Sequence, residues 1–485
     1  MELQQLLDHL LFECHHSINH ISINGVTDSS MEVEPGYVFV AIKGYQTDGH
    51  DYINDAVAKG AAAIIGENED QGLSVPYIKV ANSKKALGIV SSAFYQNPSQ
   101  NKIMIGITGT NGKTTTSYLV KHILDHLGYS CSLIGTIQNI VNGEKTTTQN
   151  TTPNALKVNQ LLSQSNDDVV IMEASSQGLA EYRLEGITFD ICLFTNLSHE
   201  HLNYHGTLDQ YFEAKSKLFS KLKPGGSAVV NADDYYGEKL INQMKEREVP
   251  VLSFGENPEA SIQMKDFKLS YPYSVQLKEG MHSCEVTSPI PGYHNLFNVA
   301  IAYACAKVLR ASSASICRAI ESFPGVEGRF NMIDFPNGST VVIDHAHTPD
   351  AVINCLQTSS ESKNGKLYHV FGFKGDKDTE KRKEMVRISA EMCDHYILTL
   401  DNLNNVPKEE MIQALNELQA NYGNEKGEIV EDRTLAIEKA LSLSKEGDWI
   451  VISGKGHQTY QHSYHFPVKS DKEAVLLLKE QIPEK

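Results

Sequence analysis

The chain has 485 residues, with 60 acidic and 43 basic side chains, and its net charge is −17. This length exceeds what one hydrophobic core supports, so we expect two to four domains. The acidic balance argues against a nucleic-acid partner, because no basic excess exists to neutralise phosphates, and it fits a soluble cytoplasmic protein.

The cysteines and the apolar segments indicate what kind of protein this is. The eight cysteines form no Cys-x-x-Cys pair. Cys131, Cys192, Cys305 and Cys355 lie in apolar surroundings, so we expect them to be reduced core residues. No charged-then-apolar signal opens the chain, and no apolar run is long enough to span a bilayer. We therefore expect no membrane association, and we expect a monomer.

The first block, residues 1–98, mixes short strands and helices. Turn residues occur at Asp28-Ser-Ser30 and Glu34-Pro-Gly36, and residues 38–42 have the composition of a strand. Residues 56–65 are typical of a helix that runs into a strand. Asn97-Pro98 is the predicted linker to the next block.

The second block opens with an apolar strand at 103–108, followed by a glycine turn, a lysine and three threonines. Gly109 and Gly112 allow backbone N–H groups to point at phosphate oxygens, and the helix that follows contributes its positive end. Lys113 can reach the β- and γ-phosphates, and the Thr114 or Thr115 hydroxyl can hold Mg²⁺. The spacing of Gly106 and Gly112 is one residue longer than in a strict P-loop. The alternative is an ordinary glycine-rich turn, but strand, glycines, lysine and hydroxyls all occur in the required order.

Apolar strands then alternate with helical segments through the rest of the chain. Strands are predicted at 169–172, 191–195, 228–230, 341–343, 367–371, 396–400 and 449–453, with a long helical region at 294–321. Such alternation predicts parallel sheets covered by helices, with ligands bound at the carboxyl ends of the strands. We predict an α/β fold with three domains: an N-terminal α/β domain (1–98), a central P-loop-type parallel-sheet ATPase domain (99–325) and a Rossmann-like C-terminal domain (326–485).

A second group of polar residues follows the predicted strands of the central block. Glu173 ends one strand and can bind Mg²⁺ directly or through water. His201 and His205 follow the next strand, and Lys215 lies in a helical stretch beyond them. Alone, each histidine would be an ordinary surface or core residue and Lys215 a solvated one. Only the run of residues 195–206, taken as a whole with the Lys215 helix, argues against these ordinary interpretations.

These motifs, in this order, resemble the Mur ligases, which build the peptide of peptidoglycan. The resemblance covers nearly the whole chain. Its superfamily motifs are Gly109-Thr-Asn-Gly-Lys-Thr-Thr115, Thr195-Asn-Leu-Ser198 with His201, Ala214-Lys215, Asn231-Ala-Asp-Asp234, Gly292-Tyr-His-Asn295 with Asn298, and Gly328-Arg329. Asp344-His-Ala-His-Thr-Pro-Asp350, Gly375-Asp-Lys-Asp378, Asp401-Asn402 and Gly454-Lys-Gly-His457 resemble the members that add the third amino acid, and Thr27-Asp-Ser29, Lys43-Gly44 and Asp48-Gly-His50 resemble their uridine-binding domain.

The resemblance implies an ATP-dependent, ADP- and phosphate-forming ligase that adds the third amino acid to UDP-N-acetylmuramoyl-L-alanyl-D-glutamate through an acyl phosphate. It implies that Lys215 is carbamylated. The implied ATP residues are Gly109, Thr110, Asn111, Gly112, Lys113, Thr114, Thr115, Asn231, Asp234, Asn295, Asn298, Arg329 and Asp344, and the implied Mg²⁺ ligands are Thr114, Glu173, His201 and Lys215.

The resemblance also assigns the two other substrates. Lys113, Lys215 and Arg329 are implied to be catalytic, and His347 is either the base that deprotonates the incoming amine or a structural histidine. The UDP-muramoyl-dipeptide is assigned to Ser29, Lys43, Asp48, His50, Thr151, Thr152, Ser175 and Arg183, and the amino acid to Lys377, Asp401, Asn402, Asn404, Gly454 and Gln458.

Several positions depart from the family pattern. Gln177, Glu200, Asn203, His345 and Ser30 replace residues usual in the family. Members that add diaminopimelate carry Arg where this chain has Lys377 and Asn404, and Glu where it has Gln458. Because a distal carboxylate favours a bidentate Arg and a distal ammonium favours an acid, we expect a neutral or singly amino side chain, as in L-lysine or ornithine, to outcompete meso-diaminopimelate. Two alternatives stay open: a Mur-type ligase with another acceptor in a specialised pathway, and a non-catalytic homologue that binds nucleotide as a regulator.

Overall fold

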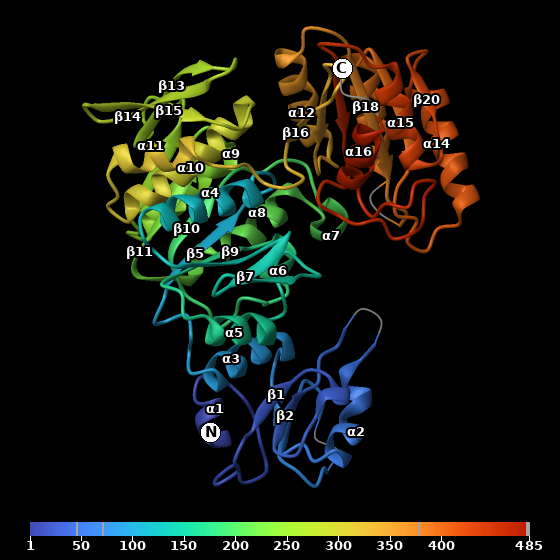
Figure 1. Cartoon of the computed structure of the whole chain (residues 1–485). Coiled ribbons are helices and arrows are strands. Elements are labelled where there is room, and N and C mark those ends of the chain that lie inside the picture. The colour runs from blue at the N-terminus through green and yellow to red at the C-terminus, as the bar shows by residue number, and fades with distance from the viewer. Residues whose placement is uncertain (45–46, 70–71, 377–378, 482–485) are drawn as a thin grey trace. The chain divides into compact units, whose positions relative to one another are not determined.

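The computed structural model describes residues 1–44, 47–69, 72–376 and 379–481. Their contacts group into two units, the first formed by Met1–Gly109, Ile123–Thr195 and Asp209–Ser253, and the second by Thr110–His122, Asn196–Leu208 and Phe254–Lys485. The α/β fold class is confirmed, with parallel sheets as predicted (Figure 1). Among the described residues, no helix combines the length and hydropathy needed to cross a membrane.

The first unit begins with a small parallel sheet. Its strands are β1 (Gly25–Thr27), β2 (Tyr37–Val40), β3 (Ala63–Gly66) and β4 (Tyr77–Lys79), in that order. α1 (Leu3–Leu7) and α3 (Ser83–Phe94) pack against one face, and α2 (Ile53–Ala58) against the other. The two short 3₁₀ segments are η1 (Ser30–Glu32) and η2 (Gly49–Tyr52). The predicted strand at 38–42 and the helix and strand within 56–65 are therefore present.

The larger sheet of the first unit has the strand order β11-β10-β5-β9-β6-β7-β8. Its five strands β11 to β6 are parallel, and β7 and β8 complete it as an antiparallel hairpin. The bounds are β5 Ile103–Thr108, β6 Cys131–Ile134, β7 Gln138–Val141, β8 Glu144–Thr147, β9 Val169–Glu173, β10 Phe189–Phe194 and β11 Leu222–Asn231. Its helices are α5 Ala155–Gln164, α6 Ser176–Ala180, α8 Leu208–Ser216 with η3 Phe219–Lys221, and α9 Tyr235–Glu246.

Two features of the chain place β5 at the centre of this sheet. Its residues are almost all buried, as expected for a strand covered on both faces. At Gly106 an added Cβ would lie 2.9 Å from Leu218 and 3.0 Å from Phe189, so only glycine fits there. β5 lies between β9 and β10 (Figure 1), so the loop after it opens at the carboxyl edge of the sheet.

The second unit contains the start of α4 (Lys113–His126), the short α7 (Leu202–His205), an antiparallel meander and a second α/β sheet. The end of β12 (Val251–Gly255) pairs with β13 (Ile262–Lys268), which continues into β14 (Tyr273–Glu279) and β15 (His282–Ser288). The predicted helical region 294–321 is two helices, α10 (Tyr293–Val308) and α11 (Ser313–Glu321). The break follows from Arg310, whose φ is 62°, and from Ser312, which caps α11 by accepting from the Ser315 amide.

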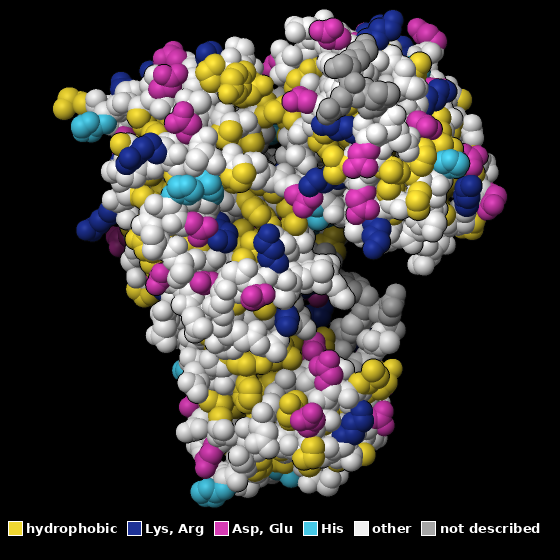
Figure 2. All heavy atoms as spheres, viewed as in Figure 1, with side chains coloured by type: hydrophobic (Ala, Val, Ile, Leu, Met, Phe, Trp, Pro, Cys, Tyr) yellow, Lys and Arg dark blue, Asp and Glu magenta, His cyan; other side chains and the backbone are white. Residues whose placement is uncertain are grey.

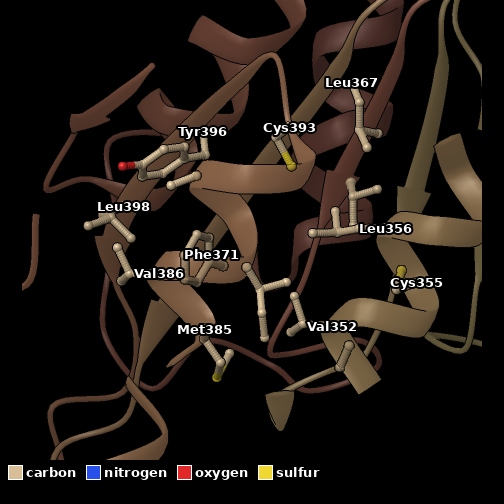
Figure 3. Packing of buried hydrophobic residues seen from close by; sticks show 14 of the residues in the cluster. Val352, Cys355, Leu356, Leu367, Phe371, Met385, Val386, Cys393, Tyr396 and Leu398 are labelled. Carbon is tan, nitrogen blue, oxygen red and sulfur yellow. The ribbon is translucent and has the colours of Figure 1, made fainter. Parts of the chain in front are cut away.

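The last sheet has the strand order β16-β17-β21-β18-β19-β20, and only β16 is antiparallel. Helices α12, α13 and α14 cover one face, where Phe371 and Leu398 meet Val352 and Met385 (Figure 3), and α15 and α16 cover the other. The bounds are β16 Asn331–Asp334, β17 Thr340–Ile343, α12 Pro349–Ser362, β18 Leu367–Phe373, α13 Glu380–Met392, β19 His395–Leu400, α14 Lys408–Tyr422, β20 Gly427–Ile429, α15 Arg433–Leu443, β21 Trp449–Ile452 and α16 Asp471–Glu480.

Candidate functional site: a glycine loop and the strand ends around it

The turn after β5 has the conformation expected of a phosphate loop. Gly109 and Gly112 have φ values of 149° and 86°, which residues with a Cβ rarely adopt. An added Cβ on Gly112 would lie 2.3 Å from the Asn298 Oδ1 atom, so α10 approaches the loop too closely for any larger residue. The loop leads directly into α4, whose first residue is Lys113. The helix therefore presents its unsatisfied amides at the loop.

A polar segment after β10 holds this loop in place. The Thr110 amide donates to the Asn196 carbonyl at 2.8 Å, and the Asn111 amide donates to Asn196 Oδ1 at 3.0 Å. The Ser198 amide donates to Thr110 Oγ1 at 3.0 Å. The sequence motif contained Asn196 and Ser198 but gave neither a role. The structure shows that they fix the shape of the loop.

The charged residues predicted for the phosphates gather at the same loop. Lys113 Nζ donates to the Thr110 carbonyl at 2.8 Å, so its ammonium lies over the loop. Arg329 reaches the start of α4, where its Nη2 donates to Thr114 Oγ1 at 3.3 Å. The Arg329 Nε atom is buried and has no hydrogen-bond partner among the described residues. Thr115 is buried on the same turn of the helix.

A chain of hydrogen bonds runs from the start of α4 to two asparagines on α10. Thr116 donates to Asn298 Oδ1 at 3.4 Å, Asn298 donates to Asn295 Oδ1 at 3.0 Å, and Asn295 donates to the Pro291 carbonyl at 2.7 Å. In the first unit, Asn231 Nδ2 donates to the Thr195 carbonyl at 3.0 Å. Asp234 caps α9 by accepting from two backbone amides. These contacts explain how the four predicted nucleotide residues are positioned.

The first unit brings Glu173 and Lys215 to the carboxyl end of β5. The last residue pair of β9 and β5 is Glu173 with Ile107, and the buried Glu173 carboxylate accepts from Thr136 Oγ1 at 2.7 Å. Lys215 is 1% exposed, and its Nζ donates to the Gly109 carbonyl at 2.6 Å. Lys215 therefore adjoins the first glycine of the loop, and Glu173 lies at the end of the strand beside β5. Sequence reasoning missed Thr136, which orients Glu173.

His201, Glu200 and His347 form a second cluster, in the second unit. His201 has a left-handed backbone with φ of 55° and lies 3.8 Å from the Glu200 carboxylate. His347 Nε2 lies 3.4 Å from the same carboxylate, and its Nδ1 is 2.9 Å from the His345 carbonyl. Burial opposes ionisation of Glu200, but His347, His201 and Lys113 together hold its pKa well below the usual range. Glu200 is therefore an ionised carboxylate between two histidines.

Asp344 positions Arg329 from the end of β17. Its two carboxylate oxygens accept from the Phe330 and Ala346 amides, both at 2.6 Å. Burial raises the pKa of Asp344, and Arg329 and these amides oppose that rise. The carboxylate thus ties the segment that carries Arg329 to the segment that carries His347.

The residues predicted for the muramoyl peptide form one group in the first unit. Thr152 Oγ1 donates to the Glu173 carbonyl at 2.8 Å and lies 3.1 Å from the Ser175 hydroxyl. Arg183 donates to the Thr152 carbonyl at 2.9 Å, and the Thr151 hydroxyl lies 3.1 Å from that of Thr136. This group is therefore continuous with Glu173.

The predicted uridine residues lie in the N-terminal sheet. His50 uses both ring nitrogens internally: Nδ1 is 2.6 Å from Asp48 Oδ1, and Nε2 accepts from the Glu67 amide at 2.9 Å. The His50 amide and ring hold the pKa of Asp48 below its usual value. Lys43 pairs with Asp48 through the backbone, and Ser29 precedes η1. These contacts give Asp48 and His50 a structural role in shaping the loop.

Four strands of the last sheet end near the predicted amino-acid residues. Asp401 follows β19 and is buried in an ion pair with Lys455 Nζ at 2.7 Å, and Lys455 also donates to Asn402 Oδ1 at 2.6 Å. Lys455 belongs to the Gly454-Lys-Gly-His457 motif, but sequence reasoning gave it no role. Asp401 therefore holds the loop after β21 in place.

The uncharged positions of this pocket are fixed by short hydrogen bonds. Asn404 Nδ2 donates to the Gly375 carbonyl at 2.6 Å, and Lys374 Nζ donates to Gln458 Oε1 at 2.7 Å. Gly454 has a φ of 103° beside Asp401. Lys377 lies outside the described residues. Lys374, which the sequence did not single out, is thus the cation that the structure shows beside Gln458.

Comparisons with known proteins match the chain to one family. Three family models match in order: "Mur ligase family, catalytic domain" at residues 22–95, "Mur ligase middle domain" at 107–306, and "Mur ligase, glutamate ligase domain" at 328–456. The chain belongs to the Mur ligase family. Because the members of this family are ligases, the expected enzyme class is confirmed.

Similar proteins in this family span the same length. A UDP-N-acetylmuramoyl-L-alanyl-D-glutamate–2,6-diaminopimelate ligase from Lactiplantibacillus plantarum is 34% identical over 496 residues, covering 99% of each chain. The ligase of the same name from Bacillus licheniformis is 37% identical and covers 90% of this chain and 91% of its own. A solved structure of a ligase with that name is 27% identical, with a TM-score of 0.71 and 99% coverage of both chains.

Proposed function

We propose that this Mur ligase uses ATP to join an amino acid to UDP-N-acetylmuramoyl-L-alanyl-D-glutamate. The observation that carries the proposal is the glycine loop at the start of α4, with Lys113 over it and Arg329 hydrogen-bonded to Thr114 at 3.3 Å. Relatives that match the chain over nearly its full length carry this activity in their names. The residues that the family resemblance assigns to phosphate are present, whereas Lys377, Asn404 and Gln458 replace the residues of the diaminopimelate-adding members.

The residues around the loop fit a nucleotide polyphosphate and a divalent cation. The loop runs into the N-terminus of α4, whose first amides have no carbonyl partner within the helix, and the buried Arg329 Nε has no partner among the described residues. Thr114 and His201 of the second unit, and Glu173 and a carbamylated Lys215 of the first, would be the ligands of Mg²⁺ by the family resemblance. Hydroxyl and carboxylate oxygens are the donors that Mg²⁺ prefers. When bound, the cation would offset negative charge on the transferred phosphoryl group.

The chemistry follows from the weak reactivity of a carboxylate. Phosphoryl transfer from ATP converts the acceptor carboxylate to an acyl phosphate, which has a good leaving group. Lys113 and Arg329 stabilise the charge spread over the transferred group, and they act without reorganising because the loop fixes them. The amine of the amino acid then attacks the acyl carbon and releases phosphate.

We assign His347 as the group that takes the proton from this amine. Its Nδ1 is 2.9 Å from the His345 carbonyl, so Nδ1 carries the proton and Nε2 is left as the basic atom. Glu200, 3.4 Å from Nε2, stabilises the imidazolium that forms. A structural role for His347 remains the competing assignment.

We propose that the ammonium of Lys374 pairs with the α-carboxylate of the amino acid, together with Lys377. Lys374 is held on Gln458, while Asp401 is already neutralised by Lys455. Asn404 and Gln458 offer no charge to a distal group of the substrate. This arrangement supports the expectation of a neutral or singly amino side chain.

The experiment is to measure phosphate release with ATP, the UDP-muramoyl-dipeptide and each amino acid in turn. Phosphate and amide product should form in equal amounts, and only when all three substrates are present. Release with another acceptor, but not with this dipeptide, would favour the specialised-pathway ligase. Nucleotide binding without turnover under any combination would favour the non-catalytic regulator.

A further inference from the structure

A pair of cysteines lies between the antiparallel meander and the helix that precedes Arg329. Cys284 is on β15 and Cys317 on α11, and these two elements pack against each other. The side chains of Cys284 and Cys317 are hydrogen-bonded to each other, and the Cys284 Sγ lies 3.5 Å from Tyr303 Oη. Neither cysteine has a role in the proposed ligase reaction.

The other cysteines differ from this pair in exposure. All eight are free thiols, and Cys131, Cys192, Cys305, Cys355 and Cys393 are buried. Cys284, Cys317 and Cys14 are partly exposed. Cys14 donates to the His16 carbonyl and has no thiol beside it among the described contacts. Only Cys284 and Cys317 therefore combine solvent access with a neighbouring thiol.

The surroundings favour a reactive Cys284. The hydrogen bond from Cys317, with Tyr303 and Lys307, lowers the pKa of the Cys284 thiol to about 6, against burial and Glu279. Lys307 Nζ lies 3.1 Å from Glu279 and 3.4 Å from Ser313 Oγ. The pKa of Cys317 is raised by the same hydrogen bond, burial and Glu321. The pKa values of the two thiols are therefore shifted in opposite directions, which favours the thiolate on Cys284 and the proton on Cys317.

We propose that Cys284 and Cys317 form a thiol modification site that closes to an intrachain disulfide on reaction with low-molecular-weight disulfides. The Cys284 thiolate attacks one sulfur of the external disulfide, its S–S bond breaks, and one thiolate leaves. Cys317 then loses its proton and attacks Cys284 sulfur, and the second thiolate leaves. Both cysteines are oxidised, and the external disulfide is reduced to two thiols.

The new bond would join the β14–β15 hairpin to α11. α11 ends at Glu321, eight residues before Arg329, so the cross-link would fix the segment that leads to this cation. Thiols already in hydrogen-bond contact need only a small side-chain movement to reach the S–S distance of about 2 Å. The same pair would bind trivalent arsenic compounds, which need two adjacent thiols.

The test uses 5,5′-dithiobis(2-nitrobenzoate) on the full native chain carrying Cys14→Ser. Two equivalents of thionitrobenzoate should be released rapidly, and the rate should follow ionisation of a group with a pKa of about 6. Peptide mapping without reduction should then find Cys284 linked to Cys317.

Two variants and a probe separate the steps. Cys317→Ser should release one equivalent and keep the mixed disulfide on Cys284, and Cys284→Ser should slow the rapid phase by at least about tenfold at pH 6.5. Phenylarsine oxide should bind one per chain only when both thiols are present. The proposal is overturned if the parent chain yields no linked peptide, or if Cys284→Ser keeps both rapid equivalents. Cys131→Ser, at a buried thiol, is the matched control and should behave as the parent.

Discussion

Lys113 and Arg329 are the two cations that converge on the start of α4, although they lie far apart in sequence. Their convergence matters because phosphoryl transfer spreads negative charge that water would otherwise solvate. Asp344 fixes the Arg329 segment through two backbone amides, so the arginine approaches in one orientation.

We predict that Lys113→Ala lowers ligation turnover by about a hundredfold or more, because the lysine charge is needed more in the transition state than in ATP binding. Steady-state kcat for amide formation measures it, and nucleotide affinity should change much less. Lys157→Ala, at an exposed lysine of α5, is the control. Near-normal ligation by the Lys113 variant would show that this loop is not the phosphate site.

Lys215 is buried against the Gly109 carbonyl at 2.6 Å, with its ammonium 4.3 Å from the centre of the Tyr211 ring. We propose that it is carbamylated in the working enzyme, since a carbamate is an anion that can bind a cation. Lys215→Ala should be poorly active, and added formate or acetate should restore part of the activity. Lys217→Ala, an exposed neighbour, should be unaffected. Full activity of the Lys215 variant without added carboxylate would show that no carbamate is needed.

At the scale of elements, function gathers where parallel strands end. In the last sheet, Asp344, Lys374, Asp401 and Gly454 follow β17, β18, β19 and β21, so all four residues lie at one edge. In the first unit, β5, β9 and β10 likewise end at one edge of their sheet. At the edge of the last sheet, Lys455 Nζ lies 2.7 Å from the Asp401 carboxylate and neutralises it. Lys374 Nζ donates to the uncharged Gln458 Oε1 at 2.7 Å, so its charge is not neutralised by that contact.

This edge predicts the choice of amino acid. We expect L-lysine or ornithine to have a higher kcat/KM than meso-diaminopimelate with the same UDP-muramoyl-dipeptide, because an unpaired distal carboxylate is costly to desolvate. Asn404→Arg should raise the relative value for meso-diaminopimelate by restoring a bidentate partner. If the parent chain prefers meso-diaminopimelate, as the names of its relatives describe for those proteins, Lys374 or other cations bind the second carboxylate and our account of the pocket is wrong.

β18 carries a buried histidine that makes this sheet sensitive to acid. His369 lies between the Ser389 and Ser453 hydroxyls at 2.9 and 2.8 Å, and burial lowers its pKa to about 3. The unfolded chain binds the proton more readily, so the free energy of unfolding should fall as pH drops from 6.5 towards 3. The slope from this residue is at most about 1.4 kcal/mol per pH unit.

Urea unfolding at pH 7 and pH 4.5 measures how much of the free energy of unfolding is lost on acidification. The loss should be smaller for His369→Gln than for the parent, whereas the exposed His465→Gln should match the parent. An equal loss in both variants would contradict this assignment.

Periodicity predicted the buried strands well: β5, β9, β11, β17, β18 and β19 contain the predicted residues, and β10 and β21 end one residue before the predicted end. The meander β13 to β15 was missed because its strands are partly exposed, so no continuous apolar run marks them. At the residue scale, motif resemblance found Lys113, Lys215 and Arg329. It gave no role to Lys455 or Asn196, because their partners, Asp401 and the glycine loop, are brought near only by the fold.

For the whole molecule, acidic and basic side chains are interspersed over the face shown in Figure 2, in keeping with small charged substrates bound at defined sites. Three family models match the chain in order, and we propose that they correspond to separate binding regions for uridine, ATP and the amino acid. A reaction through an acyl phosphate suits such a division, since a water-sensitive intermediate must be shielded until the amine arrives.

The central claim is that the acceptor carboxylate is phosphorylated before the amide forms. The most direct test is to label both oxygens of that carboxylate with ¹⁸O and to analyse the phosphate released during ligation. If the carboxylate attacks the γ-phosphorus of ATP, each phosphate released should carry one ¹⁸O, and the amide product should keep the other. Amide formation with unlabelled phosphate would contradict the account, because it would show that the γ-phosphoryl group of ATP is never transferred to the acceptor carboxylate.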